Sequence, residues 1–141
     1  MSPENSPRMR ALRMLLMMDA TVLVLLGLAF VLAPRQIEAA FHFENLPAAV
    51  SFLIGLWGCA LLTMGIGYGV AATDPQRHVV WIIVGIARGL LEALFAGWCL
   101  AREMVTWKQS GFGLLLAAFM AIGYILLYPR QTSSTEWKSS P

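Results

Sequence analysis

One apolar run, from Val79 to Ala101, is long enough to cross a bilayer and carries two charged residues, Arg88 and Glu92, near its middle. Each of these charges costs roughly 2.5 to 3.5 kcal/mol at the centre of a spanning helix. The two residues are four apart, so they share one helical face and can partly neutralise each other. We therefore predict that this face points away from lipid and into a helix bundle.

The same run carries a second stripe, in which a small residue recurs at every fourth position. Its members are Gly85, Gly89, Ala93 and Gly97. Small side chains at this spacing let another helix approach backbone to backbone. We expect this helix to be the hub of the bundle, with the stripe as its packing surface.

The composition predicts an integral membrane protein. Of its 141 residues, 58% are hydrophobic and only 13% are charged, and the mean hydropathy is +0.68. Soluble domains carry about 25% charged residues. The length leaves room for a single domain, and a net charge of +2 gives no reason to expect nucleic acid as a partner.

Four spanning helices are expected, at about residues 12–33, 47–72, 79–101 and 111–128. Residues 1–11 read as a polar, basic tail and residues 129–141 as a polar tail, while Pro34 ends the first helix and a short amphipathic surface piece follows it. Only complete helices satisfy their backbone groups in lipid, and short connections favour packing between neighbours. The predicted fold is therefore all-α, an antiparallel four-helix transmembrane bundle.

The distribution of basic residues predicts that both termini are cytoplasmic. The tails and the second loop carry more lysine and arginine than the opposite side does, and such residues favour the cytoplasm. The cytoplasmic set is Arg8, Arg10, Arg13, Arg77, Arg130 and Lys138, and the opposite set is Arg35, Arg102 and Lys108. Five aromatic residues near segment ends are expected at the membrane interface: Trp81, Trp98, Trp107, Tyr124 and Tyr128.

The first spanning segment has to include Asp19, because its uncharged part is too short to cross a bilayer. With 1.5 Å per residue, Asp19 lies about 10 Å and Arg88 about 15 Å from the cytoplasmic side, so the arginine can reach the aspartate. We predict one buried polar network of Asp19, Arg88 and Glu92. Its formal charge is negative, so Glu92, the deeper acid, is the candidate to take up a proton or attract a cation.

No metal or cofactor site is expected. Cys59 and Cys99 fall in apolar segments without a metal-binding spacing, and His42 and His78 lie in loops on opposite sides of the predicted membrane. We interpret the cysteines as small apolar core residues.

The run at the end of the second span resembles a pattern in the BphX-like family of small bacterial membrane proteins. The residues that carry the resemblance are Gly65, Ile66, Gly67, Tyr68, Ala71, Ala72, Asp74, Pro75, Arg77 and His78. The resemblance implies a four-span protein of the bacterial inner membrane, of uncharacterised function and without established enzymatic residues. Asp74, Pro75, Arg77 and His78 are its most recognisable positions. They also have a structural reading, in which Asp74 caps the next helix, Pro75 fixes the turn, and Arg77 and His78 lie at the lipid head groups.

Three classes of function remain open at this point. The leading one is a non-enzymatic accessory or binding module, which packs as a homo-oligomer or on a membrane partner protein. The alternative is an oligomeric proton-coupled transporter or channel, and the third is an enzyme acting on a lipid or quinone. The network can also be purely structural, fixing the register of the helices. Transport requires that Asp19 and Glu92 line a cavity that water can reach.

Overall fold

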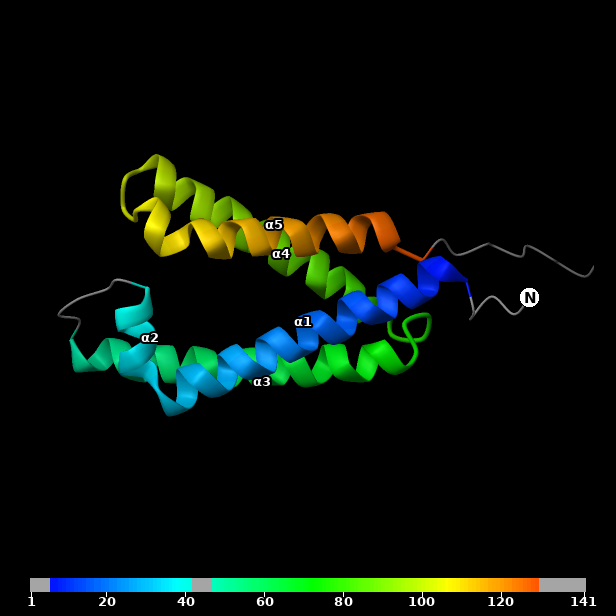
Figure 1. Ribbon diagram of the computed structural model, residues 1–141, viewed down its shortest axis with the longest axis horizontal. Coiled ribbons are helices and arrows are strands. Elements are labelled where there is room, and N and C mark those ends of the chain that lie inside the picture. Colours follow the sequence, from blue (N-terminus) through cyan, green and yellow to red (C-terminus); the bar gives the residue numbers. More distant parts are fainter. Residues whose placement is uncertain (1–5, 42–46, 130–141) are drawn as a thin grey trace, which may run out of the picture.

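The computed structural model describes residues 6–41 and 47–129, and all of its regular elements are helices. They are α1 (Pro7–Leu32), α2 (Pro34–Ala40), α3 (Ala48–Thr73), α4 (Val79–Ala101) and α5 (Trp107–Leu127), shown in Figure 1. All but α2 are long and apolar enough to cross a membrane. The prediction of an all-α bundle of four long apolar helices is confirmed. Residues 42–46 of the predicted first loop, with His42 and Glu44, lie outside the described residues, as do residues 1–5 and 130–141 of the two predicted tails.

Helix α1 begins at Pro7, earlier than the predicted start at about residue 12. The side chain of Ser6 accepts a hydrogen bond from the backbone N–H of Met9 at 3.3 Å, and Pro7 occupies the first helical position. A serine cap followed by proline is a helix start signal, which the basic residues beside it obscured in the sequence. Arg8 is therefore helical, and its Nη2 donates to the carbonyl oxygens of Leu126 and Tyr128 at 2.8 and 2.9 Å.

Two more boundaries differ from the prediction for similar reasons. Pro34 ends α1 as expected, but it also begins the short helix α2, which buries no residue and is tied to α3 where Ser51 Oγ donates to Glu38 at 2.7 Å. Helix α5 begins at Trp107 rather than at residue 111. Thr106 and Gln109 form a capping box at this start, in which the Thr106 N–H donates to the Gln109 side chain at 2.8 Å.

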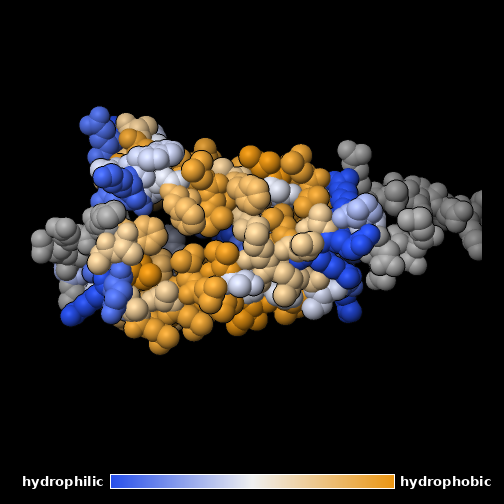
Figure 2. Space-filling model, viewed as in Figure 1, coloured by the Kyte–Doolittle hydropathy of each residue, from blue (hydrophilic) through white to orange (hydrophobic). Residues whose placement is uncertain are grey.

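The long helices form two pairs. Helix α1 packs along α3, and α4 packs along α5, whereas α3 and α4 share few contacts although a short turn joins them. The expectation that short connections make sequence neighbours the main packing partners is therefore wrong for α3 and α4. The surface of the molecule carries a broad apolar belt, which separates hydrophilic residues at its two ends (Figure 2).

Glycines bring the helices of each pair into close contact. A Cβ atom placed on Gly27 would lie 2.8 Å from the carbonyl oxygen of Gly58, so α1 and α3 meet backbone to backbone. In the other pair, a Cβ atom on Gly89 would lie 2.8 Å from the carbonyl oxygen of Ala117 on α5. Of the predicted stripe, Gly85 also faces α5, Ala93 is half-buried, and Gly97 has open space around it. The close approach of α4 to α5 is thus centred on Gly85 and Gly89.

We expect Gly89→Leu to destabilise the protein by about 1 to 3 kcal/mol, because the larger side chain would push α4 away from the backbone of α5. Gly97→Leu is the matched control, since no atom lies within 4 Å of a Cβ at that position. The measurement is thermal unfolding of both variants in the same detergent. Equal melting temperatures for the two variants would contradict the close contact at Gly89.

Candidate functional site

An ion pair joins the two helix pairs in the interior. Arg88 of α4 reaches across to Asp19 of α1, and its Nη2 donates to Oδ1 at 2.8 Å and to Oδ2 at 3.1 Å. Asp19 is only 1% exposed. Arginine binds a carboxylate strongly when both are shielded from water, so this contact holds α1 and α4 in a fixed relation.

Tyr124 of α5 supplies a further hydrogen bond to Asp19. It is fully buried, and its hydroxyl donates to Oδ2 of Asp19 at 2.8 Å. Tyr124 therefore lies inside the bundle, and its position at the membrane interface stays a prediction. The sequence contained a signal for this contact with Asp19. Tyr124 is four residues from the predicted cytoplasmic end of the last span, which puts it about 6 Å deep, on the same side of the membrane as Asp19.

Tyr68 of α3 supplies the fourth side of this cluster. The Arg88 guanidinium lies 5.2 Å from the centroid of the Tyr68 ring, which is within the range of a cation–π interaction. The Tyr68 ring also stacks with Tyr124 at 6.1 Å and meets Trp81 edge-on at 5.7 Å. We call Asp19, Tyr68, Arg88 and Tyr124 the polar cluster. It takes one residue from each of the four long helices.

Glu92 belongs to the same neighbourhood but is held less tightly. Its Oε1 lies 3.7 Å from Nε of Arg88, beyond hydrogen-bonding distance, and its side chain is 42% exposed, against 2% for that of Asp19. The structure thus brings the predicted trio of Asp19, Arg88 and Glu92 together, but Arg88 lies closer to Asp19 than to Glu92. Arg88 neutralises Asp19 closely and Glu92 only in part.

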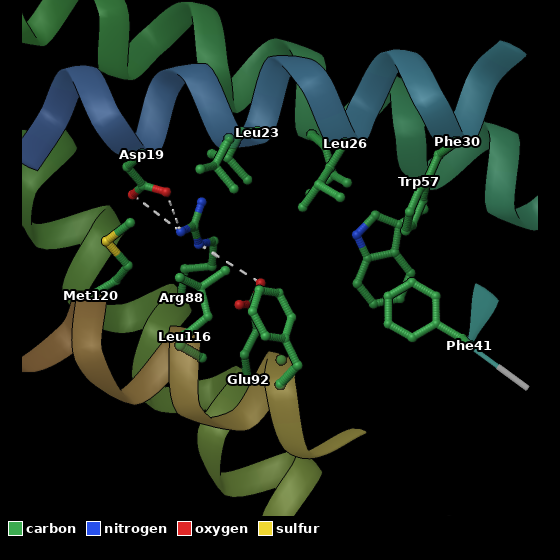
Figure 3. A pocket seen from close by; sticks show the side chains of 15 residues that line it. Asp19, Leu23, Leu26, Phe30, Phe41, Trp57, Arg88, Glu92, Leu116 and Met120 are labelled. Atoms are coloured by element: carbon green, nitrogen blue, oxygen red, sulfur yellow. Dashed lines mark hydrogen bonds and ion pairs between the residues drawn. The ribbon is translucent and has the colours of Figure 1, made fainter. Parts of the chain in front are cut away.

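A cavity of about 240 Å³ lies between the two helix pairs, and the charged trio forms one end of it. Figure 3 shows Asp19, Arg88 and Glu92 on one side, with Leu116 beside them, and Phe30, Trp57 and Phe41 on the other, with Leu23 and Leu26 between the two groups. A second cavity of about 360 Å³ adjoins it, shares Phe30, Phe41 and Trp57 as lining residues, and reaches Glu38 of α2. The space is therefore apolar along most of its length and charged at its inner end.

The turn between α3 and α4 lies apart from this cavity. Asp74 Oδ1 accepts a hydrogen bond from the Arg77 N–H at 3.2 Å, and its carbonyl oxygen lies 3.0 Å from Nδ1 of His78. Asp74 is the residue after the last turn of α3, whereas His78 precedes α4. The prediction that Asp74 caps the next helix is therefore wrong, because it caps the turn itself. Pro75 is fully buried, so this motif has a structural role.

Cys59 is exposed and Cys99 is buried, and both are free thiols. In residues 6–41 and 47–129, no three histidine, cysteine or acidic side chains gather in a way that would hold a metal ion. A search with protein-family models, with curated proteins and with solved structures finds no match to the chain. The resemblance to the BphX-like family stays a prediction.

The chemistry that this site offers is binding. An interior space of a few hundred Å³ with mainly apolar walls and a few fixed polar groups is typical of small-molecule sites in proteins. The polar groups meet only at the inner end, so they would set the orientation of a bound molecule while the walls take up its apolar part.

Proposed function

We propose that this chain is a small integral membrane protein that acts as a non-enzymatic binding module, with the cavity between its helix pairs as the binding site. Its four long helices span the bilayer in antiparallel order, with both termini in the cytoplasm of a bacterial cell. In this orientation α2 and the outer part of the cavity lie toward the opposite face of the membrane. The observation that carries the proposal is the junction of an apolar cavity with the Asp19–Arg88–Glu92 trio.

The ligand of such a module is a small amphiphilic molecule. Its apolar part would contact residues such as Leu26, Trp57 and Leu116, and its polar group would lie at the charged end. Burial of apolar surface gives roughly 25 cal/mol per Å², so the walls supply most of the binding free energy. The charged end supplies specificity, because a molecule without a matching polar group leaves that end unpaired.

Filling the cavity is expected to remove binding. Leu116 lines the cavity, whereas its neighbour Leu115 is 61% exposed on the outer surface of α5. We expect native mass spectrometry of the wild-type protein, released from bacterial membranes, to show a retained small molecule. Leu116→Trp should lose it, because the indole occupies the cavity, and Leu115→Trp should keep it.

This comparison separates binding in the cavity from lipid that adheres to the outer surface. Retention of the same mass by both tryptophan variants would place the molecule outside the cavity and contradict the proposal. The absence of any retained mass in the wild-type protein, with both variants folded, would also count against it.

A proton-coupled transporter is the second candidate, because Asp19 and Glu92 both line the cavity. Transport additionally requires that the cavity opens in turn to both sides of the membrane. Leu116→Cys in a protein without Cys59 and Cys99 tests this requirement, with thiol reagents that cannot cross the bilayer applied from each side in turn. Labelling from both sides indicates a two-sided path, and labelling from one side indicates a one-sided binding site. An enzyme acting on a lipid or quinone is the third class. Its catalytic groups would have to come from the polar cluster and Glu92.

A further inference from the structure

The charge balance of the cavity favours a cationic ligand. Two carboxylates, Asp19 and Glu92, face a single guanidinium, that of Arg88. The other titratable groups beside the Asp19–Arg88 pair are the hydroxyls of Tyr68 and Tyr124, which carry no positive charge. With both acids ionised, the inner end of the cavity therefore carries one uncompensated negative charge.

The geometry places this excess charge on Glu92. Asp19 receives both hydrogen bonds from Arg88 Nη2 and a third from Tyr124, whereas Glu92 has only the 3.7 Å contact with Arg88 Nε. Asp19 is also closed off from its surroundings, while nearly half of the Glu92 side chain is open. A ligand that enters the cavity thus meets the carboxylate that lacks a close partner.

The rest of the lining also suits a cation. Four aromatic side chains line the cavity beyond Glu92, namely Phe30, Phe41, Trp57 and Phe112. Aromatic ring faces attract cations and at the same time bury apolar surface. Glu38, whose carboxylate accepts a hydrogen bond from Ser51, borders the adjoining cavity, and no lysine or arginine lines that cavity.

We propose that the cavity binds a lipophilic organic cation, such as a bulky amine or a quaternary onium ion. This inference rests on the proposed binding function and names the ligand class. The charged atom lies beside the Glu92 carboxylate, and the apolar substituents lie against the aromatic walls. Arg88 Nη2 is bound by Asp19, whereas its Nε and Nη1 are buried without a hydrogen-bond partner among the described residues. An anion is disfavoured by the net charge of the inner end, because two carboxylates face this one guanidinium. A neutral ligand leaves the excess charge without a counter-charge.

Tetraphenylphosphonium and tetraphenylborate test this inference, because they have nearly the same size and shape and opposite charges. Each is titrated by equilibrium dialysis against the full-length protein in lipid nanodiscs, and partitioning into empty nanodiscs is subtracted. We expect saturable binding of tetraphenylphosphonium and none of tetraphenylborate. Glu92→Gln should weaken phosphonium binding by about tenfold or more, because the substitution removes the unpaired charge.

Glu103→Gln is the matched control, because Glu103 is exposed in the connection between α4 and α5 and lines neither cavity. It removes the same charge from the protein and should leave phosphonium binding unchanged. Equal affinity of the wild-type protein for both probes would overturn the inference without any variant. An equal loss of affinity in Glu92→Gln and Glu103→Gln would overturn it as well, since only the overall charge would then matter.

The two proposals fail in different ways. If the wild-type protein retains a small molecule that Leu116→Trp loses, but does not bind tetraphenylphosphonium, the binding function stands and the cationic ligand class is wrong. If neither a native molecule nor either probe binds, both proposals are wrong.

Discussion

Arg88→Leu is expected to lower the free energy of unfolding by about 3 to 5 kcal/mol, because it leaves the buried carboxylate of Asp19 without its positive partner. The remaining hydrogen bond from Tyr124 cannot neutralise that charge. The loss should be visible in denaturant titrations of the protein in mixed micelles. It should exceed the loss from a leucine substitution at an arginine outside the interior, such as Arg102, whose side chain is exposed.

A second substitution shows whether the cost comes from the stranded charge. Asp19→Leu combined with Arg88→Leu should recover most of the lost stability, because apolar residues of similar volume often replace a buried ion pair at little cost. Glu92→Gln combined with Arg88→Leu should recover much less, since Glu92 is farther from Arg88 and partly exposed. Equal stability of the single variant and both double variants would rule out a coupled network.

Tyr124→Phe is expected to cost about 1.5 to 3 kcal/mol, the range for a hydrogen bond to a charged group. The hydroxyl of Tyr124 donates to Asp19 at 2.8 Å, and the substitution leaves that carboxylate with one donor fewer. The measurement is the free energy of unfolding in the conditions used for Arg88→Leu. The double variant with Asp19→Leu should show no further loss, because the acceptor is then absent.

Tyr68→Phe provides a control that is matched in both chemistry and burial. Tyr68 and Tyr124 are both fully buried and their rings stack, but the Tyr68 hydroxyl has no hydrogen-bond partner among the described residues. Removing that hydroxyl should therefore be neutral or stabilising. If both substitutions cost the same, the contact between Tyr124 and Asp19 contributes no specific stability.

Hydropathy was sufficient to predict the number and class of the long helices, and simple depth arithmetic was sufficient to predict that Arg88 reaches Asp19. Both inferences depend on single helices, whose rise per residue is fixed. The partners of each helix were not predictable in the same way. Small residues identify a face that can pack closely, but they do not say which helix it meets. Gly58 contacts α1 rather than the next helix in the chain, and Gly97 contacts nothing within 4 Å.

The cavity could not be predicted from the sequence for a related reason. It exists because two helix pairs stand apart over part of their length, and this separation is a property of the assembled bundle. The starts of α1 and α5, in contrast, were readable from Ser6–Pro7 and from Thr106 with Gln109. These signals were outweighed by the polar character of the segments in which they lie.

The contacts between the two helix pairs are concentrated at one end of the molecule. Arg8 binds the carbonyl oxygens at the end of α5, Gly123 lies against Leu15, and Tyr68 meets Trp81, whereas the cavity occupies the space farther along, toward α2. The α1–α3 pair and the α4–α5 pair are thus in contact near one end of the molecule, and Figure 1 shows them diverging toward the other end. A rotation of a few degrees about these contacts changes the distance between Phe41 and Gly113 far more than that between Asp19 and Arg88. Such a rotation would change the width of the cavity at its α2 end and leave the Asp19–Arg88 distance nearly unchanged.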